Sequence, residues 1–146
     1  MNVRSKLAAA ALTGGLVLGG VTLAAPASAA VAGNGDYCGP TTQVVPGGSV
    51  YAKACVSINN GVYQAHAYVT SQGFGNTFGG SNVFINSGGH YYGYGACSFP
   101  SNATFYNMTC YGLPQTSSIN GYVQGQIELV VNGGYYKAFS PSEYVG

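Results

Sequence analysis

The sequence predicts an all-β fold, an antiparallel β-sandwich of about seven strands with an immunoglobulin-like architecture. From residue 30 onward the chain holds only two leucines, Leu113 and Leu129, but all 13 tyrosines, and this composition favours strands over helices. Runs of Val, Tyr, Ile and Thr alternate there with clusters of Gly, Asn and Pro, and no apolar residues repeat at helical spacing. A small β-barrel is the alternative architecture.

Two hairpins are the clearest elements. Residues 49–58 (SVYAKACVSI) lead through Asn59-Asn60-Gly61 into residues 62–70 (VYQAHAYVT). Residues 121–131 (GYVQGQIELVV) lead through Asn132-Gly133-Gly134 into residues 135–140. Asn-Gly pairs supply the positive φ angles of a tight hairpin turn, so both segments are expected to fold back on themselves.

Alternation along these strands assigns their faces, because successive side chains of a strand point to opposite sides. The core side is expected to hold Tyr63, Ala65, Ala67 and Val69 in the first hairpin and Val123, Ile127, Leu129 and Val131 in the last. The opposite side is expected to hold His66, facing solvent, and Tyr122, Gln124, Gln126 and Glu128.

Three further strands are expected at residues 82–86, 90–98 and 105–111. Residues 30–48, with Gly, Pro, Asn and Thr throughout, are expected to form an irregular N-terminal arm. The folded part would then be a single β domain over residues 49–146.

Residues 1–29 have the pattern of a cleaved signal peptide. Arg4 and Lys6 precede an uncharged apolar stretch at residues 7–25, and Ala27-Ser28-Ala29 matches a cleavage site. A transmembrane anchor is the alternative for an apolar stretch of this length, but its glycines and the Pro26 that follows it favour cleavage. We therefore expect a secreted protein, extracellular or associated with the cell wall, with no membrane span after processing.

The four cysteines are expected to form two disulfides, because export leads to an oxidising environment. Pairing Cys38 with Cys55 and Cys97 with Cys110 closes two short loops, and each loop of this size is worth roughly 3 kcal/mol. The interleaved pairings are the open alternatives. None of the gaps between cysteines has the short spacing of a zinc site.

The low charge of the chain argues against nucleic-acid binding and against an enzyme or metal site built from ionisable groups. Loss of Arg4 and Lys6 with the leader would change the formal net charge from +1 to −1, so no nucleic-acid partner is expected. The remaining charged side chains are Asp36, Lys53, Glu128, Lys137 and Glu143. So few ionisable groups leave little material for acid–base chemistry or a metal cage, and we expect a non-enzymatic protein without cofactor or metal.

His66 and His90 are the only imidazoles. Either could join a Ser and a carboxylate, Asp36 or Glu128, in a hydrolytic triad, but the chain has no G-x-S-x-G motif, H-x-H pair or H-E-x-x-H motif. No catalytic or metal-binding residue is therefore predicted. A minimal hydrolase using one of the two histidines stays as a third hypothesis.

Five tyrosines are the candidate binding residues: Tyr91, Tyr92, Tyr94, Tyr135 and Tyr136. Aromatic rings on a sheet face stack on sugar rings, and Tyr, Asn and Gln donate hydrogen bonds without charge, which suits a glycan or cell-wall polymer. The alternative for these rings is that they fill the core of a leucine-poor protein. A second alternative is an interaction with an extracellular protein, as in a protease inhibitor or effector, through the loop at residues 74–81.

The leader ending in APASAA, followed by AKACVS, an Asn-Gly turn, QAHAYV, GACS and a final Cys110, resembles the small secreted disulfide-bonded β proteins of high-GC Gram-positive (actinobacterial) bacteria. Those proteins are mostly uncharacterised. The resemblance implies an exported β-sandwich and carries no catalytic residues.

Overall fold

The computed structural model describes residues 30–146 apart from 74, 101–104 and 117–118, so the predicted leader lies outside the described residues. Ten strands follow one another: β1 (Gly35–Cys38), β2 (Thr42–Gln43), β3 (Val50–Asn59), β4 (Val62–Gln72), β5 (Ser81–Ser87), β6 (His90–Cys97), β7 (Phe105–Tyr111), β8 (Gly121–Val131), β9 (Gly134–Phe139) and β10 (Glu143–Val145). The described part of the chain contains no helix long and apolar enough to cross a membrane.

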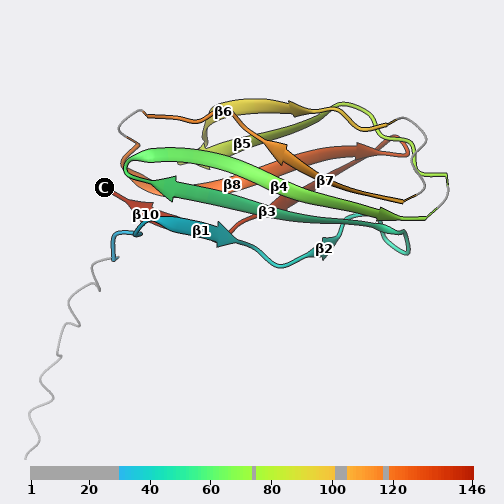
Figure 1. Ribbon diagram of the computed structural model, residues 1–146, viewed down its shortest axis with the longest axis horizontal. Coiled ribbons are helices and arrows are strands. Elements are labelled where there is room, and N and C mark those ends of the chain that lie inside the picture. The colour runs from blue at the N-terminus through green and yellow to red at the C-terminus, as the bar shows by residue number, and fades with distance from the viewer. Residues whose placement is uncertain (1–29, 74, 101–104, 117–118) are drawn as a thin grey trace, which may run out of the picture.

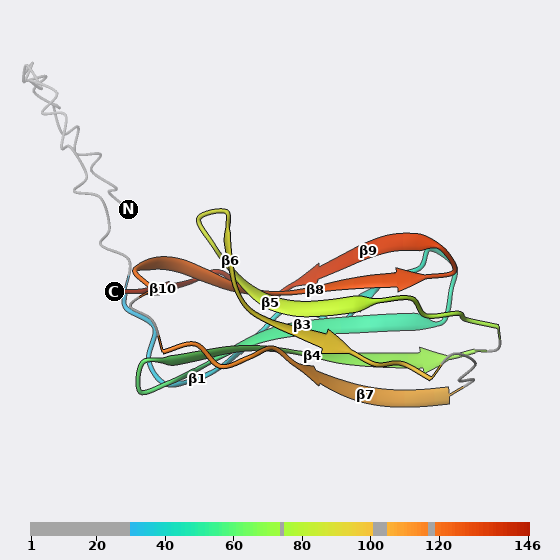
Figure 2. The ribbon, with the colours of Figure 1, turned by 90° about the horizontal axis from the view of Figure 1, so that it is seen from above.

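The strands form two antiparallel sheets that face each other. The first sheet has the order β1-β3-β4-β7, with β2 also paired to β3, and the second has the order β10-β8-β5-β6, with β9 also paired to β8. The two layers are separate along most of their length (Figures 1 and 2). Among the described residues the sheets do not close into a barrel, so the predicted β-sandwich is confirmed and the barrel alternative is wrong.

Both predicted hairpins form, and their turns have the predicted chemistry. Asn60 and Gly61 have φ values of 49° and 77°, and Asn132 and Gly133 have φ values of 50° and 77°. Two successive positive φ angles match the twist of the flanking strands. The turns thereby fix the register of β3 on β4 and of β8 on β9.

The arm expected to be irregular contains two of the strands. β1 pairs with β3 from Gly35↔Ile58 to Cys38↔Cys55, and β2 pairs with β3 at Thr42 and Gln43. Short strands in a Gly- and Thr-rich segment carry no hydrophobic alternation, so the sequence pattern does not reveal them. Their pairing with β3 comes from the tertiary fold.

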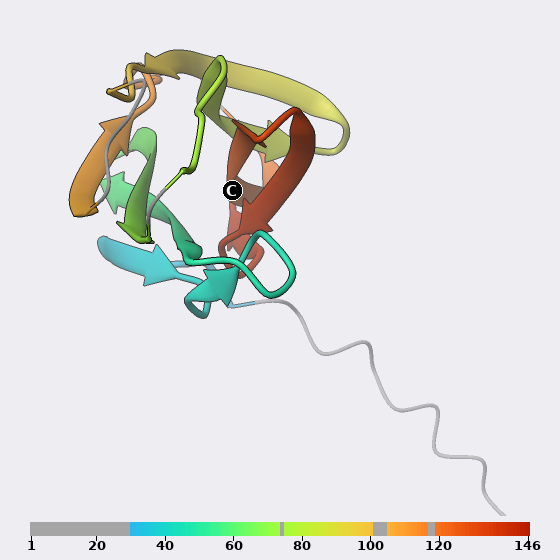
Figure 3. The same ribbon diagram turned by 90° about the vertical axis from the view of Figure 1, so that its right-hand side faces the viewer.

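The core lies between the sheets and consists of the residues that alternation assigned to it. Ala65, Ala67 and Val69 of β4 and all four predicted core residues of β8 are fully buried, and Tyr63 packs partly against them. Seen along the strands, the sheets enclose this core (Figure 3). At Gly125 of β8 no side chain separates the sheets, because a methyl group there would lie 2.1 Å from the carbonyl oxygen of Cys55 of β3.

Both disulfides have the predicted connectivity. Cys38–Cys55 joins the neighbouring strands β1 and β3 at directly opposed positions of the first sheet. Cys97–Cys110 joins β6 to β7 and thereby links the second sheet to the first. The first bond stays within one sheet, whereas the second ties the two layers together.

Candidate functional site

The outer side of the second sheet carries a group of aromatic rings from three strands. We call it the aromatic face and define it as Phe84, Tyr91, Tyr94, Tyr135 and Phe139. The register places Phe84 and Phe139 close together, because both lie opposite Gln126. Tyr135 lies opposite Val130, on the same side of the sheet but four residues further along β8. Three of the five predicted tyrosines therefore share one surface.

Phe84 is the centre of the aromatic face. Its side chain is only 1% exposed, although it points away from the core. The ring centroids of Tyr91 and Tyr94 lie 5.1 and 4.8 Å from that of Phe84, within the range of favourable aromatic contacts. An irregularity in the pairing of β5 with β6 between Val83 and Ile85 brings these rings over it. Tyr91 and Tyr94 are thus held in place from below while half of each side chain stays exposed.

Polar groups complete the aromatic face without adding net charge. Lys137 Nζ lies 2.9 Å from Glu128 Oε1 and 5.4 Å from the ring centroid of Tyr135. Gln126 donates a hydrogen bond of 3.0 Å to the same carboxylate oxygen. Partial burial raises the pKa of Glu128, but hydrogen bonds from Tyr135 and Lys137 outweigh it and hold this pKa below its usual value. The ion pair therefore stays ionised and internally neutral.

Tyr92 and Tyr136 do not belong to this surface. Both pack against the core and are only partly exposed. Each directly follows a tyrosine of the aromatic face, and adjacent side chains of a strand point to opposite sides. The five tyrosines predicted as binding residues therefore do not share one surface, and the alternation along each strand already separates these two from Tyr91 and Tyr135.

The outer side of the first sheet buries a histidine instead. His66 was expected to face solvent, but it is only 4% exposed. It lies opposite Cys55 on β3 and Tyr111 on β7, and its ring stacks on that of Tyr111 with centroids 5.8 Å apart. The ring of Tyr68 meets that of His66 edge-on, with centroids 5.5 Å apart. The prediction was wrong because Cys55, Tyr68 and Tyr111 cover the ring of His66, although it points away from the core.

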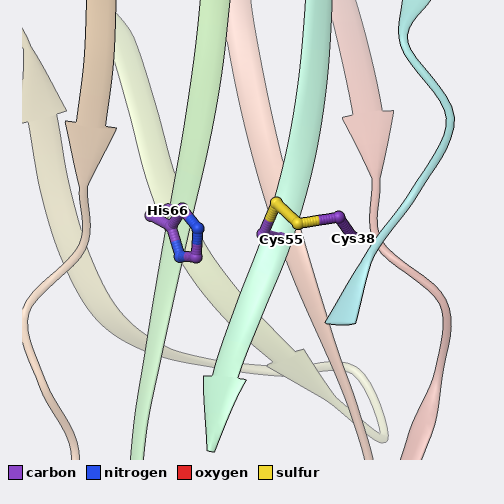
Figure 4. A group of neighbouring side chains, drawn as sticks. All are labelled: Cys38, Cys55 and His66. Carbon is purple, nitrogen blue, oxygen red and sulfur yellow. A yellow bond between two sulfur atoms is a disulfide. The ribbon is translucent and has the colours of Figure 1, made fainter. Parts of the chain in front are cut away.

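Figure 4 shows His66 beside the Cys38–Cys55 disulfide. One ligating atom from each of the three residues lies within 4.8 Å of the other two. We call these residues the His66 group. No short motif links them in the sequence, and they come from β1, β3 and β4. Burial lowers the pKa of His66, the charge of Asp36 opposes this effect, and the charge of Lys53 adds to it.

A chain of hydrogen bonds extends from His66 to a carboxylate. Ser57 Oγ donates to Asp36 Oδ1 and lies 3.1 Å from His66 Nδ1. Because a carboxylate only accepts, the single hydroxyl hydrogen of Ser57 is directed to Asp36, and His66 Nδ1–H donates to the serine oxygen. A catalytic triad has the opposite order, in which the serine donates to the histidine and the histidine to the carboxylate.

The remaining candidates lie apart. His90 is exposed at the start of β6, and Glu143 lies in β10. In the loop proposed for protein contacts, residue 74 lies outside the described residues, and Asn76 is buried in a hydrogen-bonded group with Ser71 and Asn132. Phe78 forms a bridge to Val131. The described part of this loop is therefore fastened to the sandwich.

The chain matches none of the protein-family models, curated proteins or solved structures with which it was compared.

Proposed function

We propose that this protein is a secreted, non-enzymatic binding protein whose aromatic face binds an uncharged glycan polymer of the kind found in cell walls. The observation that carries the proposal is the exposure of Tyr91, Tyr94 and Tyr135 on one side of a single sheet, at 50%, 49% and 57%. Exposed rings of this kind offer flat apolar surfaces to the C–H faces of sugars.

The dimensions and polarity of the surface support a polymer. The surface extends across four neighbouring strands, from β6 over β5 and β8 to β9. Neighbouring strands are about 4.8 Å apart, so it is roughly 14 Å wide. Asn82, Asn86 and Gln124 share this side of the sheet and supply uncharged hydrogen-bonding groups around the rings. The neutral Glu128–Lys137 pair gives no preference for a charged ligand.

Two disulfides fit a protein that works outside the cell, where they persist. An extracellular site of action gives a glycan-binding surface access to wall polymers. The expected partner is therefore a polysaccharide, and neither nucleic acid nor a cofactor enters the proposal.

The test is co-sedimentation of the oxidised protein, residues 30–146, with insoluble peptidoglycan, chitin and cellulose. We expect retention on at least one polymer, and loss of that retention in Tyr94→Ala and Tyr135→Ala. Tyr111→Ala is the matched control, because Tyr111 is equally exposed, at 59%, but lies on the first sheet.

Absence of retention on every polymer would contradict the proposal. An equal loss in Tyr111→Ala and Tyr94→Ala would contradict its location on the second sheet. Circular dichroism of each variant separates loss of binding from loss of folding.

A further inference from the structure

We propose that the His66 group becomes a metal site when the Cys38–Cys55 disulfide is reduced. The two thiolates and the imidazole would bind a divalent ion of the zinc class, and water would occupy the fourth position. The proposal does not depend on glycan binding, since the two sites lie on opposite sheets.

The sheet register places the three ligands in one row. Cys38 lies opposite Cys55, and Cys55 lies opposite His66, so β1, β3 and β4 each contribute one ligand. Their ligating atoms already lie within 4.8 Å of one another. Zinc binds sulfur at about 2.3 Å and imidazole nitrogen at about 2.0–2.1 Å, which places tetrahedral ligand atoms roughly 3.3–3.8 Å apart. The two sulfurs, which are bonded to each other in the disulfide, would move apart to this separation after reduction and the imidazole nitrogen would approach them, both by side-chain rotation, because the strands hold the three backbones side by side.

The surroundings suit a bound cation. Cys55 is fully buried and His66 nearly so, whereas Cys38 is partly exposed and leaves a path from solvent. Tyr68 and Tyr111 both pack against the imidazole and limit its rotation. Asp36, held by Ser57 next to His66, adds a negative charge close to the site.

The chemistry is balanced with a dithiol as reductant. The dithiol transfers two electrons and two protons to the Cys38–Cys55 bond, which yields two cysteine thiols and the oxidised, disulfide form of the reductant. The metal ion then displaces the two thiol protons and forms two metal–sulfur bonds and one metal–nitrogen bond. In the reverse exchange the oxidised, disulfide form of the reductant accepts two electrons from the two thiolates, the Cys38–Cys55 bond re-forms and the ion is released.

The other cysteine pair is an internal comparison. In the part of the chain that the structure describes, Cys97 and Cys110 do not belong to a group of three or more possible ligands. Reduction of that pair therefore gives two thiols without a neighbouring imidazole. A difference between the pairs isolates the contribution of His66.

The experiment is a cobalt titration of the protein before and after reduction with a dithiol that is then removed. The reduced protein is expected to bind one Co²⁺ with thiolate-to-cobalt charge-transfer absorption, and Zn²⁺ is expected to displace it. The oxidised protein is expected to show no such band. His66→Gln should weaken binding by at least about tenfold, while His90→Gln should leave it unchanged.

A Cys97→Ser/Cys110→Ser variant is expected to bind cobalt as the unchanged chain does, and Cys38→Ser/Cys55→Ser to lose the band. Circular dichroism with and without metal monitors folding. A reduced chain that remains unfolded with cobalt, or binds it equally well without His66, would overturn the proposal.

Discussion

The two outer faces of the sandwich each bury one ring at their centre, but they bury it differently. On the second sheet, Phe84 lies beneath two tyrosines and makes only apolar contacts with them. On the first sheet, His66 lies among a disulfide, two tyrosines and a hydrogen-bonded serine. On the second sheet the buried ring only supports the aromatic rings above it. On the first sheet the buried ring belongs to a group that can titrate or bind an ion.

The difference shows that the covering residues decide what an outward-pointing ring does. Tyr91 and Tyr94 lie over Phe84 and remain half exposed, so burial of Phe84 positions rings that a ligand can reach. The groups around His66 are chemically reactive, because the Cys38–Cys55 disulfide can be reduced and the nearby Asp36 carries a charge. Substitutions on each face test this difference.

The largest effect is expected at the centre of the aromatic face. Phe84→Ala should lower the free energy of unfolding by about 3–5 kcal/mol, because a fully buried phenyl ring is lost and a cavity remains. Urea denaturation monitored by circular dichroism measures it. Phe139→Ala, on the same face but 43% exposed, should cost less than about 1 kcal/mol. Similar losses for the two would show that Phe84 does not support this face.

The second largest effect on the free energy of unfolding is expected from removal of a disulfide. Replacing either pair with alanine should cost about 3 kcal/mol, since the bonded cysteines are 17 and 13 residues apart and close loops of similar length. Only removal of Cys38 and Cys55 should also change the titration of His66, measured from its ring protons by NMR. An unchanged titration would mean that the disulfide does not shape the environment of His66.

Acidification is expected to destabilise the protein through His66. Burial holds the pKa of His66 below the value of 6.5 that it has in the unfolded chain. The unfolded chain therefore binds more protons, and the free energy of unfolding should fall as the pH drops below about 6.5. His66→Gln should flatten this part of the profile, and the exposed His90, changed to Gln, serves as the control. Urea midpoints on both sides of that pH measure the difference, and parallel profiles for all three proteins would contradict it.

The smallest effect on stability is expected for the ion pair of the aromatic face. Lys137→Gln should raise the pKa of Glu128, because a hydrogen bond and a positive charge are lost. The midpoint of thermal unfolding should hardly change, since pairs at the surface contribute little. An NMR titration of the Glu128 carboxyl group measures the first effect. A clear fall in the midpoint would show that the pair is structural.

The seven predicted strands all exist, because long alternating segments and Asn-Gly turns report local structure directly. Pairing across the hairpins was also accessible. Cys55 and His66 are the fifth residues before Asn60 and after Gly61, and Glu128 and Lys137 are the fourth residues before Asn132 and after Gly133. Counting outward from each turn predicts both contacts.

The other contacts of His66 and the burial of Phe84 depend on strands that are distant in the sequence and meet only in the folded protein. Tyr111 covers His66 from β7, and Cys38 reaches it from β1, a strand without a hydrophobic pattern. Phe84 occupies a position that alternation assigns to solvent, and its cover depends on the irregular pairing of β5 with β6. No local pattern in the sequence encodes these contacts.

The contact between Gly125 and the carbonyl oxygen of Cys55 has a mechanical consequence. Packed sheets usually stand about 10 Å apart with side chains between them, and such a layer can absorb small movements. Here β8, which lies between the strands of the aromatic face, and β3, which contains Cys55 of the disulfide, lie backbone against backbone. A displacement of β3 at Cys55 would therefore act directly on the backbone of β8, with no side chain between the two strands to absorb it.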